Sequence, residues 1–106
     1  MGRWVRAAAL ADVPPGSAKA VRLEGRWVAL FHDPDRGLMA TDDTCPHEGA
    51  ALSEGTYHDG RVICPRHAWV FDVSTGECLR MPDVTLACYA TRPAGDDVEI
   101  ELPDGG

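Results

Sequence analysis

Short stretches in which apolar and polar side chains alternate recur along this chain, and turn-forming residues separate them. Such alternation is typical of β-strands that bury one face. It predicts strands at residues 20–23, 27–31, 38–41, 56–58, 61–64, 70–73, 85–92 and 98–102. Glu24-Gly25-Arg26 and Asp59-Gly60 each separate two of these segments, and both sequences favour hairpins.

Helical periodicity is confined to the beginning of the chain. Only Val5 to Val13 could hold a helical turn, and Pro14-Pro15 would end it because proline lacks the backbone donor. Closely spaced strands with glycine and proline turns predict an all-β sandwich or barrel-like fold. The length of 106 residues, without an internal repeat or a linker, predicts a single domain over residues 1–106.

Charge and hydropathy exclude several classes of partner. The chain has 17 acidic against 10 basic residues, a net charge of −7, which argues against binding to nucleic acid or to an anionic membrane. A basic face on a partner protein would suit it better. No stretch approaches the roughly 20 apolar residues needed to cross a bilayer, and no signal peptide is visible. We therefore expect a cytoplasmic protein whose four cysteines are reduced.

Two short cysteine–histidine motifs carry the candidate chemistry. Cys45-Pro46-His47 follows one predicted strand, and Cys64-Pro65-Arg66-His67 ends another. The 16 residues between His47 and Cys64 contain a complete hairpin, so the two loops should lie side by side. Each loop offers one thiolate and one imidazole, and its proline restricts the backbone before a metal arrives.

The distribution of ligands favours iron over zinc. A zinc finger normally places its cysteines on one turn and its histidines on a helix, whereas here each loop contributes one of each. Mixed loops suit a binuclear cluster in which the cysteines bind one iron and the histidines the other. A structural zinc module remains the alternative at this point, and metal and sulfide analysis would separate the two.

With these motifs the chain resembles the Rieske [2Fe-2S] family, and the resemblance extends over nearly the whole chain, including the turn at 71–76 after the second loop. It implies three stacked antiparallel sheets, with the cluster at the tip of a small subdomain formed by roughly residues 42–80. It also implies one [2Fe-2S] cluster, with Cys45, His47, Cys64 and His67 as its ligands.

Departures from the family pattern narrow the resemblance. Respiratory-chain members join the two loops by a disulfide, but the matching positions here are Ala50 and Arg66. Those members also direct a serine and a tyrosine hydroxyl at sulfur atoms, where this chain has Trp69 and Phe71. The chain is therefore more similar to soluble, low-potential Rieske ferredoxins of bacterial ring-hydroxylating oxygenase systems, and to the small subunit of assimilatory nitrite reductase.

The resemblance implies an electron carrier rather than an enzyme. Oxygenase chemistry needs a mononuclear iron in a separate domain, for which this chain has no room. We expect a flavin-containing reductase as electron donor and a terminal oxygenase as acceptor; the alternative acceptor is the large subunit of a nitrite reductase. A small apolar surface around the loops should support a transient contact. Its predicted members are Pro46, Ala50, Ala51, Leu52 and Pro65.

The remaining histidines and cysteines have simpler interpretations. His32 and His58 are expected to be exposed structural residues. Cys78 and Cys88 are expected to be free thiols, since a disulfide between them does not suit the cytosol. Alternation with Leu86 and Ala90 predicts that Cys88 is a small core residue.

Overall fold

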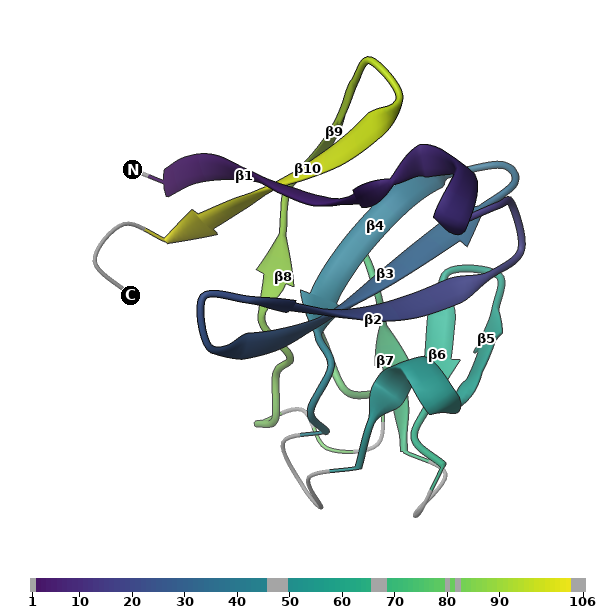
Figure 1. Ribbon diagram of the computed structural model, residues 1–106. Helices are drawn as coiled ribbons and strands as arrows, with labels where there is room; N and C mark the ends of the chain where they lie inside the picture. The colour runs from purple at the N-terminus through teal and green to yellow at the C-terminus, as the bar shows by residue number, and fades with distance from the viewer. Residues whose placement is uncertain (1, 46–49, 66–68, 80, 82, 104–106) are drawn as a thin grey trace.

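A computed structural model describes residues 2–45, 50–65, 69–79, 81 and 83–103 of the chain. In these residues nearly all regular structure is β, arranged as three antiparallel sheets (Figure 1). The predicted all-β fold with three sheets is therefore confirmed. Within the same residues, no helix has the length and apolar character that crossing a bilayer requires.

Two of the sheets form the larger part of the molecule. One has the order β1 (Gly2–Ala9), β10 (Asp97–Pro103), β9 (Thr91–Ala94). The other has the order β2 (Ala18–Leu23), β3 (Arg26–Asp33), β4 (Gly37–Asp42), β8 (Cys88–Tyr89). Their facing side chains make one core, whose buried members are Ala8, Val13, Val21, Val28, Leu30, Ala40, Val98, Ile100 and Leu102.

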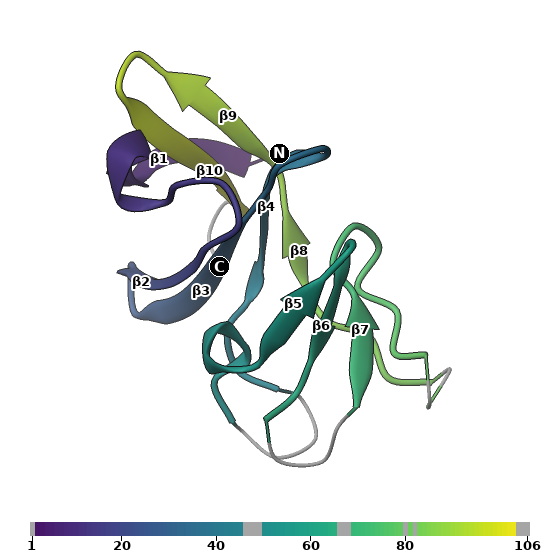
Figure 2. The ribbon, with the colours of Figure 1, turned by 90° about the vertical axis from the view of Figure 1, so that its right-hand side faces the viewer.

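The third sheet is smaller and lies on the other side of β3. It consists of β5 (Thr56–His58), β6 (Arg61–Ile63) and β7 (Val70–Asp72), preceded by the 3-10 turn η2 (Leu52–Glu54) (Figure 2). Ala29 and Phe31 of β3 enter the core of this unit, whereas Val28 and Leu30 enter the first core. A strand that is buried on both faces reads as a continuous apolar run, and the segment Trp27–Phe31 does so.

Both predicted hairpins are present, with backbone geometry that explains their sequences. Glu24 and Gly25 have φ of 50° and 87°, and Asp59 and Gly60 have φ of 50° and 83°. Two successive residues in the left-handed region are what a two-residue type I′ turn requires. These turns fix the registers of β2 with β3 and of β5 with β6.

Two sequence predictions of secondary structure were only partly right. The helical turn expected within Val5–Val13 is present at Leu10–Asp12, as the 3-10 segment η1. Residues 5–9 instead belong to β1, which pairs along its length with β10. The single strand expected at 85–92 is divided into β8 and β9, which belong to different sheets.

A buried polar cluster ties the small sheet to the larger unit. The carboxylate of Asp33, at the end of β3, is 3% exposed and accepts the Tyr57 hydroxyl at 2.6 Å and the backbone N–H of Arg36 at 2.9 Å. Arg36 also donates to Asp59 at 2.8 Å. The bond from Tyr57, with those from Arg36 and Asp35, holds the pKa of Asp33 well below its usual range. Asp33 therefore stays ionised although it is buried, and the Tyr57 hydroxyl of β5 is one of the donors that stabilise its charge.

Replacing Tyr57 by Phe should separate the sheets more easily, because it removes the neutral donor closest to this buried charge. We expect the midpoint of thermal unfolding, followed by circular dichroism, to fall by roughly 5–10 °C. His58→Ala, on the same strand but with an exposed side chain, is the control and should change the midpoint little. Equal midpoints for the two variants would contradict the role given to Asp33.

Candidate metal centre

The first and second cysteines are buried together at one end of the molecule. Cys45 follows β4, Cys64 follows β6, and both strands end on the side that is lowest in Figure 1. Each cysteine is 1% exposed, and both belong to the core shared by the small sheet and β3. None of the four cysteines forms a disulfide, which is a condition for Cys45 and Cys64 to act as thiolate ligands.

The two cysteine loops are closed in the same way. The Cys45 N–H donates to the Ala50 carbonyl at 2.8 Å, and the Cys64 N–H donates to the Trp69 carbonyl at 2.8 Å. In both loops the bond joins residue i to residue i+5. Each cysteine therefore begins a six-residue loop whose ends are fixed by its own backbone.

The predicted histidine ligands lie within these loops in sequence, His47 between Cys45 and Ala50 and His67 between Cys64 and Trp69. Both fall outside the described residues. No group of three or more candidate metal ligands occurs within the described part of the chain. The two buried thiols, held in matching loops and without disulfides, fit a metal centre that takes one cysteine from each loop.

The surroundings of the cysteines are apolar. Phe71 is fully buried in the same core, and Trp69 is partly buried against it. The nearest tyrosine in this unit, Tyr57, gives its hydroxyl to Asp33. Trp69 and Phe71, which replace the serine and tyrosine of respiratory-chain members, are therefore both in contact with the core that holds the cysteines.

The predicted apolar surface around the loops needs correction. Leu52 is fully buried in the cysteine core and cannot contribute to a surface, because η2 turns its side chain inward. Ala50 and Ala51 are partly exposed, Pro65 is exposed, and Pro46 lies outside the described residues. Sequence reasoning missed the large exposed apolar side chains of the described residues, which are Trp27, Leu79 and Met81, at 49%, 50% and 45% exposure.

Cys78 and Cys88 are free, as expected, but their positions differ from the prediction. Cys78 is 3% exposed in the same core as Cys45, opposite Phe71. Cys88 is exposed rather than a core residue, because only Leu86 of its predicted face is buried. Partial burial nevertheless raises the pKa of the Cys88 thiol, which lies 3.4 Å from the Val73 carbonyl oxygen. A protonated thiol is a poor metal ligand.

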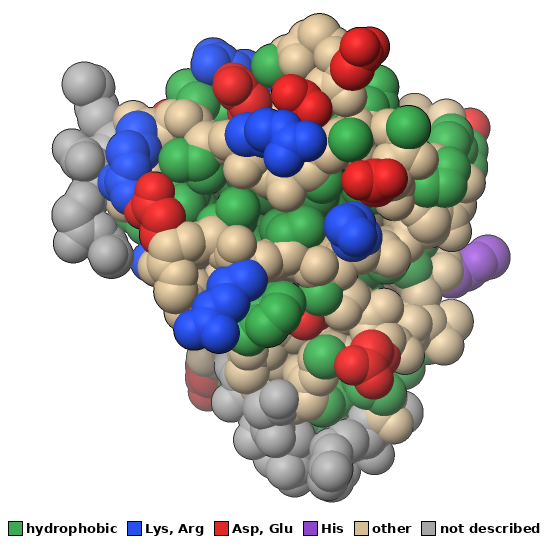
Figure 3. Space-filling view, in the orientation of Figure 1, with side chains coloured by type: hydrophobic (Ala, Val, Ile, Leu, Met, Phe, Trp, Pro, Cys, Tyr) green, Lys and Arg blue, Asp and Glu red, His purple; other side chains and the backbone are tan. Residues whose placement is uncertain are grey.

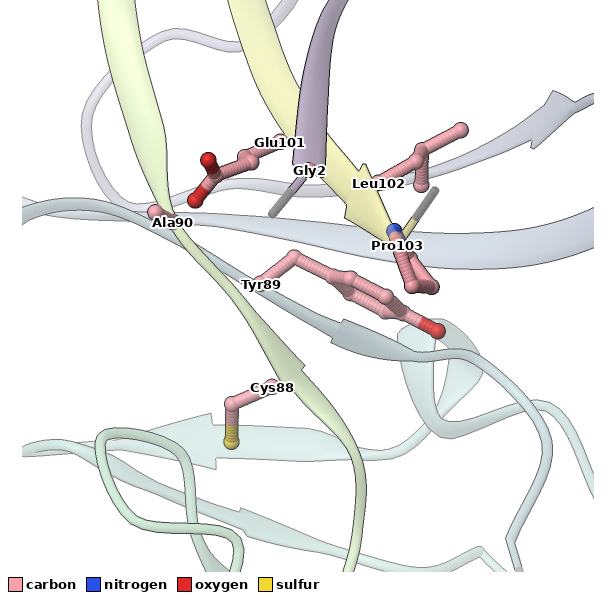
Figure 4. Close-up of a pocket in the computed structure, with 7 residues that line it drawn as sticks. All are labelled: Gly2, Cys88, Tyr89, Ala90, Glu101, Leu102 and Pro103. Carbon is pink, nitrogen blue, oxygen red and sulfur yellow. The ribbon is translucent and has the colours of Figure 1, made fainter. Parts of the chain in front are cut away.

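Cys88 also lines a hollow of about 400 Å³ among β1, β8 and β10, with Tyr89 and Leu102 (Figure 4). None of the described residues of the two cysteine loops lines this hollow. The His32 ring nitrogen Nδ1 lies 2.6 Å from the Val13 carbonyl oxygen, which makes His32 a structural, partly buried residue. His58 is exposed, as expected.

Ion pairs gather on the face that carries β1 and β2, where Figure 3 shows acidic and basic side chains beside one another. They include Arg3 with Glu24, Arg6 with Asp97 at 3.1 Å, and Arg92 with Glu99 at 2.8 Å. Exposed pairs of this kind contribute little stability. In these pairs, acidic side chains neutralise arginines that lie far from the cysteine loops.

Comparison with known proteins assigns this arrangement to a family. A family model for the Rieske [2Fe-2S] domain matches residues 3–90. The ferredoxin component of a naphthalene 1,2-dioxygenase system from Pseudomonas aeruginosa is 34% identical over 101 residues, which cover 94% of this chain and 96% of that protein.

Solved structures agree with the sequence match. A complex of oxygenase and ferredoxin from carbazole 1,9a-dioxygenase contains a chain with a TM-score of 0.81 and 30% identity, covering 92% of each chain. A Mycobacterium tuberculosis protein described as an NADH-dependent nitrite reductase small subunit has a TM-score of 0.88 and 27% identity, covering 97% of each chain.

The four cysteines provide a controlled test of the metal centre. Cys45→Ala and Cys64→Ala should each lose most of the bound metal, because each removes the thiolate of one loop. Cys88→Ala should retain it, and Cys78→Ala should retain it at a cost of about 1 kcal/mol of stability from the smaller core side chain. Metal content per chain is the measurement. Equal loss in all four variants would show that the effect is one of folding and not of ligation.

Proposed function

Because the chain belongs to the Rieske [2Fe-2S] domain family, we propose that it is an electron carrier, which passes electrons one at a time from a reductase to a terminal oxygenase. The [2Fe-2S] cluster supplies the one-electron redox chemistry when it is bound. The observation that carries the proposal is the pair of fully buried cysteines at the start of two identically closed loops. Relatives matched over more than nine-tenths of their length include ferredoxin components of dioxygenase systems.

We assign Cys45, His47, Cys64 and His67 as the four ligands. The cysteines support the assignment by their burial and by the absence of disulfides. The histidines support it by sequence position, since each lies between the two ends of a closed loop. The cysteines would hold the buried iron, and the histidines the iron nearer to the surface through which electrons pass.

We treat residues 1–106 as a single domain in which roughly 42–80 form the cluster-binding subdomain. In support, both cysteine loops and the whole β5–β6–β7 sheet fall within that range. The core of this part is closed by Ala29 and Phe31 of β3, which argues against an independent domain. Four cysteines without a disulfide suit a reducing compartment, and we therefore propose that the protein is cytoplasmic.

The partners we propose are a flavin-containing reductase and a terminal oxygenase. A nitrite reductase large subunit is the second candidate acceptor, because the fold matches a nitrite reductase small subunit with a TM-score of 0.88. Affinity purification from the native host separates the candidates. Recovery of an oxygenase supports the first, and recovery of a large sirohaem-containing reductase supports the second.

The metal content tests the cofactor directly. Protein purified in air should be red-brown and contain about two iron and about two acid-labile sulfide atoms per chain. Inductively coupled plasma spectrometry and a colorimetric sulfide assay measure these values. A colourless protein with stoichiometric zinc would contradict the proposal.

The reduction potential should lie at the low end of the Rieske range, which extends from roughly −150 to +300 mV. Hydrogen bonds to sulfur stabilise the more negative reduced cluster, and Phe71 brings no hydroxyl to the cysteine core. We expect a midpoint below about 0 mV that is nearly flat from pH 6 to 8. Phe71→Tyr should raise it. Protein-film voltammetry is the measurement, and a wild-type midpoint near the top of the range would show that other donors surround the cluster.

A further inference from the structure

Large apolar side chains that are exposed gather at the end of the molecule that carries the cysteine loops. In the described chain they are Trp27, Leu79 and Met81, at 49%, 50% and 45% exposure. The Leu79 N–H donates to the Val70 carbonyl at 2.8 Å, and Val70 pairs with Ile63, the residue before Cys64. Leu79 therefore lies beside the second loop, and Trp27 lies beside the first.

Trp27 extends the face of β3 that covers the cysteine core. Ala29 and Phe31, on the same face, are fully buried in that core, whereas Trp27 lies past its edge. The Trp27 carbonyl accepts the Asp43 N–H at 3.0 Å, two residues before Cys45. Trp27 therefore lies beside the start of the first cysteine loop.

The indole forms one wall of a hollow of about 360 Å³. The other lining side chains used in the argument below are those of Ala51, Asp43 and Glu54, and none of the described residues that line the hollow is basic. Asp43 is 4% exposed and its carboxylate accepts the Ser53 N–H at 2.7 Å, while Glu54 is exposed. Arg22 lies over the Trp27 ring at 5.8 Å but does not line the hollow.

We propose that this hollow receives a lysine or arginine side chain from the protein's redox partner. An aromatic face beside two carboxylates is attractive to a cation and repels an anion. A purely apolar side chain would gain nothing from either carboxylate. The hollow includes Thr44, the residue before Cys45, and so adjoins the end through which electrons leave. The inference deepens the proposed function and rests on it.

The opposite sheet offers a matched control. Trp4 of β1 and Glu101 of β10 are register partners in the sheet farther from the cysteine loops, and Arg92 lies 4.2 Å over the Trp4 ring. The double variants Trp27→Ala/Glu54→Gln and Trp4→Ala/Glu101→Gln therefore remove the same groups at two different places. The visible spectrum and midpoint potential of each variant should match those of the wild type.

Cytochrome c, a basic one-electron acceptor with exposed lysines, serves as the probe. Protein reduced with dithionite is mixed with it in a stopped-flow instrument at low and at high salt. Trp27→Ala/Glu54→Gln should lower the second-order rate constant about 5- to 10-fold at low salt, and the control pair less than about 2-fold. The difference should shrink at high salt. Trp27→Phe alone should retain most of the rate, because an aromatic face remains.

Equal rate constants for the two double variants at low salt would overturn the inference while leaving the proposed function intact. A wild-type protein that holds its cluster but passes no electrons to cytochrome c would instead overturn the proposed function.

Discussion

The structure depends on burying two thiols from distant parts of the chain in one apolar core. Cys45 and Cys64 are each 1% exposed, yet a thiolate is costly to bury without a cation to compensate its charge. The core that holds them is built from three directions, by β3, by η2 and by the β5–β6–β7 sheet. A cluster bound between them would compensate the charge of both thiolates, and would thereby join the small sheet to the loop that follows β4.

For both cysteines to hold one cluster, the small sheet must keep the same position on β3 in the oxidised and in the reduced protein. The contacts between them are both apolar and polar. The Phe31 and Tyr57 rings stack at 5.3 Å, and the Tyr57 hydroxyl continues to the buried Asp33 carboxylate. The backbone adds a close approach at Gly55, where a Cβ atom would lie 2.1 Å from the Ile63 carbonyl oxygen. A carrier gains from such rigidity, because reorganisation around the cluster would slow each electron transfer.

The sequence predicted most of the strands, both hairpins and the two cysteine loops, because each has a local signal. Asp59-Gly60 predicts a turn because these residue types readily adopt positive φ. The spacing of cysteine and histidine predicts the loops because these residue types are metal ligands. What sequence missed depends on distant pairing. The segment 2–9 has no clear strand pattern of its own and becomes a strand by pairing with β10. Leu52 was predicted to be a surface residue, but the turn η2 directs its side chain into the core. The partnership of Asp33 with Tyr57 spans 24 residues and has no local pattern at all.

We propose that one thiolate and one imidazole from each loop ligate the same cluster. The most direct test is pulsed electron paramagnetic resonance of the reduced protein, with histidine labelled by ¹⁵N. We expect two strongly coupled histidine nitrogens, which disappear one at a time in His47→Cys and His67→Cys variants that retain a cluster. A reduced protein with a [2Fe-2S] signal but no strongly coupled histidine nitrogen would contradict it.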